Sequence, residues 1–125
     1  STLAAERATE SDIVFLEETL SRNEGEVLTA EAETEADIAF HMGIAYATHN
    51  SVYVDLTKRF YEYMFYRIKE MHSFLYEVQV NLEEVERQHF VILEGIKSHD
   101  PELARKGMLD HIQFLRELLY KHSND

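Results

Sequence analysis

Residues 82–97 read Leu-Glu-Glu-Val-Glu-Arg-Gln-His-Phe-Val-Ile-Leu-Glu-Gly-Ile-Lys, and the apolar residues of this stretch follow a spacing of three and four. This spacing places them along one face of an α-helix. Asp100 and Pro101 follow shortly after, and these residue types are favoured as the N-cap and the first residue of a helix. The sequence therefore predicts a helical hairpin whose second helix runs from Pro101 to about His122.

The rest of the chain has the same helical character and few residues that interrupt it. Its 125 residues include one proline and four glycines, and no stretch alternates between apolar and polar residues as a strand would. The expected helices cover residues 3–8, from 9 to a stop at 23–25, 29–48, 52–72, 82–97 and 101–122. The pattern predicts an all-α fold, an antiparallel bundle of about six helices around a central metal or ligand cavity.

The composition excludes several classes of protein. The formal net charge of −12 disfavours direct contact with a phosphate backbone. Cysteine is absent, which excludes disulfides and thiolate metal sites. No apolar run is long enough to span a membrane and the start is not a signal peptide, so we expect a cytoplasmic protein without a membrane partner. The chain begins without methionine inside an expected helix, as a fragment of a longer protein would.

Four polar residues lie on the apolar faces of three expected helices, where a buried side chain is normally aliphatic. They are Asp37 and His41 in 29–48, His89 in 82–97, and His111 in 101–122. The apolar neighbours that define the two later faces are Leu82, Val85, Ile92 and Ile96, and Ala104, Met108, Leu115 and Leu118. The other four histidines fall at turns or helix ends and are expected to be solvated: His49, His72, His99 and His122.

Helix geometry predicts that these four side chains meet. Asp37 and His41 are four residues apart and therefore neighbours on one face. At 1.5 Å per residue, His89 lies ~15 Å before the hairpin turn and His111 ~16 Å after it, so the two imidazoles are level. Unpaired buried polar groups cost a few kcal/mol each, and a divalent cation would satisfy all four. One carboxylate and three imidazoles suit zinc, nickel, manganese or iron(II). The alternative to a metal site is that these histidines are core residues that pair with other groups within the protein.

The same residues resemble a known family. The motifs that carry the resemblance are Asp37-Ile-Ala-Phe-His41, Ala47-Thr-His-Asn50, His89-Phe-Val-Ile-Leu-Glu-Gly-Ile96, Asp100-Pro-Glu-Leu-Ala104 and Met108-Leu-Asp-His111. They look like the ligand-sensing C-terminal (FCD) domain of FadR-type GntR transcription regulators. The resemblance implies that residues 1–125 form an effector-binding and dimerisation domain. It also implies that in the full regulator this domain follows a winged helix-turn-helix, and that the present sequence would start after that domain and most of the first helix.

The resemblance also implies which residues bind ligands. By position, Asp37, His41, His89 and His111 would hold the divalent cation, and the carboxylate of a small organic acid would complete its coordination. Among the remaining residues, Asn50 and Arg67 are candidates for contacts with that effector.

The expected function is therefore a metal-dependent effector sensor rather than an enzyme. It would act as a homodimer and would reach DNA only through the missing N-terminal domain. One alternative is a small hydrolase-like metalloenzyme with a metal-bound water as nucleophile, although no well-placed general base stands beside the four ligands. The other alternative is a purely structural helical bundle.

Overall fold

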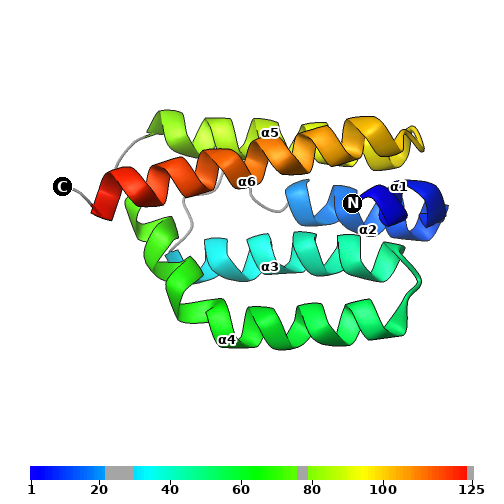
Figure 1. Cartoon of the computed structure of the whole chain (residues 1–125), viewed down its shortest axis with the longest axis horizontal. Helices are drawn as coiled ribbons and strands as arrows, with labels where there is room; N and C mark the ends of the chain where they lie inside the picture. Colours follow the sequence, from blue (N-terminus) through cyan, green and yellow to red (C-terminus); the bar gives the residue numbers. More distant parts are fainter. Residues whose placement is uncertain (22–29, 76–78, 124–125) are drawn as a thin grey trace.

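The computed structural model describes residues 1–21, 30–75 and 79–123, and these residues form six α-helices and no strand (Figure 1). The helices are α1 (Thr2–Arg7), α2 (Glu10–Ser21), α3 (Ala30–Ala47), α4 (Ser51–Leu75), α5 (Gln79–Lys97) and α6 (Pro101–Ser123). The predicted all-α bundle is confirmed, whereas the expected stop at 23–25 lies outside the described residues. Among the described helices, none combines the length and the apolar composition needed to span a bilayer.

The helices form two antiparallel pairs with a short pair between them. Figure 1 shows α5 and α6 side by side along one edge, and α3 and α4 side by side along the other. The short helices α1 and α2 fill the space between these pairs at one end, where α2 contacts α3 and α5. Helix α4 packs mainly against α3 and forms the outer edge of the molecule. Three of the four long helices, α3, α5 and α6, therefore face one another across the interior.

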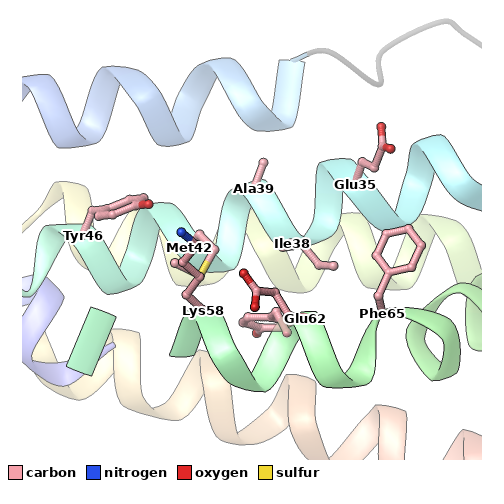
Figure 2. A pocket seen from close by; sticks show the side chains of 9 residues that line it. Glu35, Ile38, Ala39, Met42, Tyr46, Lys58, Glu62 and Phe65 are labelled. Carbon is pink, nitrogen blue, oxygen red and sulfur yellow. The ribbon is translucent and has the colours of Figure 1, made fainter. Parts of the chain in front are cut away.

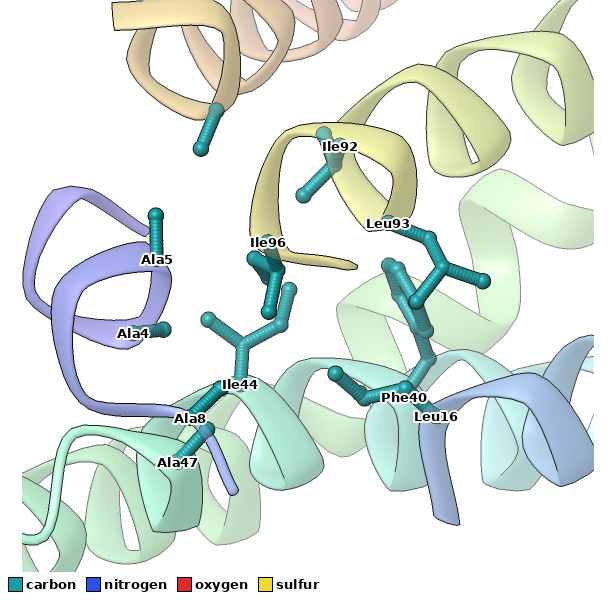
Figure 3. Packing of buried hydrophobic residues seen from close by; sticks show 11 residues of the cluster. Ala4, Ala5, Ala8, Leu16, Phe40, Ile44, Ala47, Ile92, Leu93 and Ile96 are labelled. Atoms are coloured by element: carbon teal, nitrogen blue, oxygen red, sulfur yellow. The ribbon is translucent and has the colours of Figure 1, made fainter. Parts of the chain in front are cut away.

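The hydrophobic core lies where α1, α2, α3, α5 and the first turn of α6 meet (Figure 3). Small residues of α1 allow a close approach of that helix, and larger side chains of the other helices fill the centre. The core residues are Ala4, Ala5, Ala8, Leu16, Phe40, Ile44, Ala47, Ile92, Leu93, Ile96 and Ala104. Phe40 and Ile92 are fully buried, and each lies within three residues of a histidine predicted to face the interior. The core thus fixes α3 and α5 next to the candidate site.

The turn between α3 and α4 and the turn between α5 and α6 have the same capping arrangement. Asn50 Oδ1 accepts hydrogen bonds from the first backbone N–H groups of α4, and Asp100 Oδ1 accepts one from the first turn of α6. The residue before each cap is a histidine in the left-handed region, His49 with φ 53° and His99 with φ 52°. The predicted cap at Asp100 is confirmed.

These two turn histidines also make tertiary hydrogen bonds that the sequence did not predict. His49 Nε2 lies 2.8 Å from Asp12 Oδ2, and His99 Nδ1 lies 2.9 Å from the carbonyl oxygen of Ala5. Burial alone would raise the pKa of Asp12, but hydrogen bonds from Thr9 and His49 outweigh it and lower that pKa. His49 and His99 are exposed, as expected, yet they also anchor both turns to α1 and α2. The side chains of His72 and His122 lie outside the described part.

Candidate metal centre

The structure brings together the four polar residues that the helix faces indicated. Asp37 and His41 come from α3, His89 from α5 and His111 from α6, and one ligand atom of each lies within 4.8 Å of the others. The Nε2 atoms of His41 and His89 each lie 3.3 Å from Asp37 Oδ1. The Nε2 atoms of His89 and His111 are 3.3 Å apart. Three helices therefore direct one carboxylate oxygen and three imidazole nitrogens at a common point.

These distances fit the coordination shell of a divalent cation. Two ligand atoms at ~2.1 Å from one cation lie ~3.0 Å apart at an octahedral angle and ~3.4 Å apart at a tetrahedral angle. The 3.3 Å separations within the cluster fall between these values. The donor set also suits the borderline metals zinc, nickel, manganese and iron(II). The residues present therefore fit the cation that the sequence predicted.

Burial and charge leave Asp37 and His89 in the protonation states that a cation requires. His89 and His111 retain 6% and 2% of their surface exposed. Burial alone would raise the pKa of Asp37, but His41 and His89 outweigh it and hold that pKa well below its ordinary value. Burial lowers the pKa of His89 in spite of the nearby Asp37 carboxylate. An ionised carboxylate therefore faces a neutral imidazole, and both have lone pairs available for a metal.

Residues around the cluster hold its rings in place, and the sequence reasoning did not identify them for this role. Gln88 accepts a hydrogen bond from His111 Nδ1 at 2.8 Å. The Phe40 ring centroid lies 4.7 Å from that of His89, and the Tyr61 ring stacks on His41 at 6.1 Å. Burial, with the Asp37 charge, raises the pKa of Tyr61, so its hydroxyl stays protonated. Tyr61 lies on α4, to which the sequence assigned no metal ligand, and Gln88 lies one position away from the apolar stripe of α5.

A groove of about 370 Å³ runs between α3 and α4 (Figure 2). Its lining is mostly apolar: Glu35, Ile38, Ala39, Met42, Tyr46, Lys58, Tyr61, Glu62 and Phe65. Ile38 directly follows Asp37 along α3, and Met42 directly follows His41. Tyr61 both lines the groove and stacks on His41. The groove therefore runs alongside the histidine cluster, with the Tyr61 ring between them. The predicted central cavity is a separate feature and stays a prediction.

The two predicted effector contacts lie at the surface. Asn50 is exposed, and its side-chain oxygen caps α4. Arg67 is exposed on α4, six residues after Tyr61 and therefore roughly 120° around the helix from it. Arg7, the last residue of α1, donates a hydrogen bond to the Thr48 carbonyl oxygen at 3.1 Å. The roles of Asn50 and Arg67 in effector binding stay predictions.

Comparison with known proteins places the chain in a family. The model of the FCD domain matches residues 1–114. The Uxu operon regulator of Haemophilus influenzae is 32% identical over 124 residues, which is 97% of this chain and 46% of that protein. The Glc operon transcriptional activator of Escherichia coli K12 is 28% identical over 94% of this chain and 48% of its own length.

A third relative is the Uxu operon transcriptional regulator of E. coli K12, 29% identical over 97% of this chain and 48% of that protein. The chain thus spans less than half the length of each of these relatives. The family match confirms the resemblance drawn from the motifs around Asp37 and His89. The chain therefore belongs to the FCD domain family, and the relatives that it matches are operon regulators of the GntR type.

Proposed function

We propose that this chain is the effector-sensing domain of a GntR-type transcription regulator and that it binds one divalent cation through Asp37, His41, His89 and His111. The observation that carries the proposal is the convergence of these four ligand atoms in the interior of the bundle. Three of the helices that supply the core also supply the ligands. A cation would therefore link α3, α5 and α6 and stabilise the folded state.

The proposed effector is a small organic acid whose carboxylate binds at the cation. Four protein ligands leave further positions open on an octahedral metal, and a carboxylate oxygen is a suitable ligand there. The groove between α3 and α4 has an apolar lining and adjoins the cluster at Tyr61. We place the carbon skeleton of the effector in this groove. The metal supplies affinity for the carboxylate in this proposal.

Control of DNA binding would require a second domain. The charge of −12 disfavours direct contact between this domain and DNA. An effector can regulate only if it binds one arrangement of the protein more tightly than another. The arrangement that it would select is that of two winged-helix domains held by a dimer of this domain. A cytoplasmic location follows from that role and is part of the proposal.

The proposal predicts that protein purified without chelator contains close to one equivalent of metal per chain. Small mono- and dicarboxylates should then raise the Tm of the metal-loaded domain and leave that of the metal-free domain unchanged, because their binding requires the cation. Elemental analysis and thermal shift measurements test both points. A metal-free protein whose Tm ignores added Zn²⁺ and Ni²⁺ would contradict the metal site, and conversion of a carboxylate to product would favour the metalloenzyme.

A groove-filling variant, Met42→Trp, serves as the control for where the effector lies. The larger side chain should occupy the groove and suppress the carboxylate response, whereas the response to the metal alone should persist. If the carboxylate response also persists, the groove is not part of the effector site.

We further propose that the homodimer forms through the outer face of α4. Apolar residues at helical spacing project from this face, and each keeps between 54% and 82% of its surface exposed: Val52, Leu56, Phe60, Tyr63 and Tyr66. A continuous exposed apolar stripe of this kind marks an interaction surface. A two-fold axis across α4 would bury the same stripe of both copies.

Phe60→Glu is expected to weaken this dimer at least ~10-fold, because it places one charge of each copy in the apolar centre of the interface. Sedimentation equilibrium measures the change. Leu109→Glu is the matched control, since it charges an apolar residue of α6 that is 51% exposed. A Phe60→Glu protein that dimerises as tightly as the control would place the interface elsewhere.

A further inference from the structure

Gln88 is a buried polar residue whose side chain makes two specific hydrogen bonds, one of them to another helix. It is buried with 4% of its surface exposed, next to His89 in α5. Its Oε1 atom lies 2.8 Å from Nδ1 of His111 in α6, and its Nε2 atom lies 3.0 Å from Oε1 of Glu84. One turn of α5 therefore provides both a member of the cluster and a side chain that holds the histidine of the opposite helix.

The charge of Glu84 determines which way the Gln88 amide points. Hydrogen bonds from Arg87 and Gln88 lower the pKa of Glu84 to about 2, so this carboxylate only accepts hydrogen bonds at neutral pH. The amide nitrogen of Gln88 must then face Glu84, and its oxygen must face His111. An oxygen at that position requires a proton on Nδ1 of His111. The lone pair of His111 Nε2 is therefore directed at the cluster, 3.3 Å from Nε2 of His89.

Arg87 extends this arrangement to the surface of α5. Its guanidinium donates to both carboxylate oxygens of Glu84, at 2.6 and 3.0 Å. Arg87 and Gln88 thus hold Glu84 from two sides, three and four residues along the same helix. The chain of hydrogen bonds runs from Arg87 through Glu84 and Gln88 to His111.

We propose that Gln88, oriented by Glu84, is a positioning residue that fixes His111 in the tautomer able to bind a cation through Nε2. This proposal rests on the proposed function, because the proposed function assigns the metal to the cluster. Hydrogen-bonded neighbours of this kind set the ring orientation and the tautomer of histidine ligands. The residue acts through His111 and has no contact with the metal in this proposal.

Gln88→Met removes the acceptor and retains most of the volume of the side chain. The dissociation constant for Zn²⁺, measured by calorimetric titration of the metal alone, should rise about 10- to 100-fold. Nitrogen-15 NMR of the metal-free protein should show the Nδ1-protonated form of His111 in the wild type and a mixture of tautomers in the variant. Unchanged affinity together with an unchanged tautomer would overturn the proposal.

The matched control is Gln113→Met. Gln113 is exposed on α6 and donates to Glu117 four residues away, as Gln88 donates to Glu84, but among the described side chains it has no hydrogen bond to a histidine. Its replacement should leave Zn²⁺ affinity unchanged. An equal loss of affinity in this control would show that the effect of Gln88→Met is not specific.

A double variant separates positioning from packing. Glu84→Gln combined with Gln88→Glu exchanges the two side chains, keeps the net charge, and again places an acceptor on Nδ1 of His111. The double variant should restore Zn²⁺ affinity to within a few-fold of the wild type. It also provides the decisive measurement if Gln88→Met does not fold, because a folded double variant with weak Zn²⁺ affinity would contradict the proposal. If the wild type binds no metal, the proposed function fails, whereas the His111 tautomer still tests the role of Gln88.

Discussion

Replacing His89 with alanine is expected to abolish the stabilisation of this domain by Zn²⁺ or Ni²⁺. The imidazole is buried, and its Nε2 atom lies 3.3 Å from both Asp37 Oδ1 and His111 Nε2, so alanine at this position removes one of the four proposed ligands from the centre of the cluster. A cation present at about 1,000 times its dissociation constant stabilises a protein by about 4 kcal/mol. For a domain of this size that corresponds to about 15 °C in Tm. Thermal denaturation with and without metal measures the difference.

The matched control for His89→Ala is His49→Ala. The His49 side chain is 49% exposed and bonds to Asp12 outside the cluster, so its loss should lower the baseline Tm and leave the metal-induced shift intact. Both variants are compared with their own metal-free forms, which removes the effect of lost packing. A full metal response in His89→Ala would show that the cation binds elsewhere.

The helical periodicity of the sequence was sufficient to predict the convergence of Asp37, His41, His89 and His111. Periodicity determines which face a residue occupies, and the marked turn at Asp100 and Pro101 sets the register of the last two helices. Together these determine the height of each side chain in the bundle. The start of α5 was predicted less accurately. The structure begins this helix at Gln79 rather than at residue 82, and no proline or glycine marks the boundary in the sequence.

Contacts that depend on side-chain conformation could not be predicted in the same way. Gln88 lies beside the apolar stripe rather than on it, and its role depends on an amide that reaches across to another helix. His49 and His99 were predicted to be solvated, because the sequence does not show which carbonyl or carboxylate of α1 and α2 faces each turn. The stacking of Tyr61 on His41 could not be predicted, because it depends on the distance between α3 and α4, which periodicity does not provide.

Gly95→Ala is expected to destabilise the fold by about 2 kcal/mol, or roughly 8 °C in Tm, although alanine favours helix. A Cβ atom at Gly95 would lie 2.5 Å from the backbone nitrogen of Ala104 and 2.7 Å from its Cα. Backbone atoms cannot rotate away, so α5 and α6 must separate, and overpacking of this kind costs up to about 3 kcal/mol. The gain of about 1 kcal/mol in helix propensity offsets only part of that cost. Denaturant titration gives the free energy of unfolding.

Gly107→Ala on the facing helix is the matched control, because the gain in helix propensity is the same. Its Cβ would lie 3.1 Å from Val91 Cγ1 and 3.3 Å from Ile92 Cγ1, which are side-chain atoms that can shift. The expected change in stability is therefore small, and equal losses in the two variants would refute a backbone clash at Gly95. The close approach of α5 and α6 also sets the separation of His89 and His111. Gly95→Ala should therefore weaken Zn²⁺ binding as well as folding, whereas Gly107→Ala should preserve both.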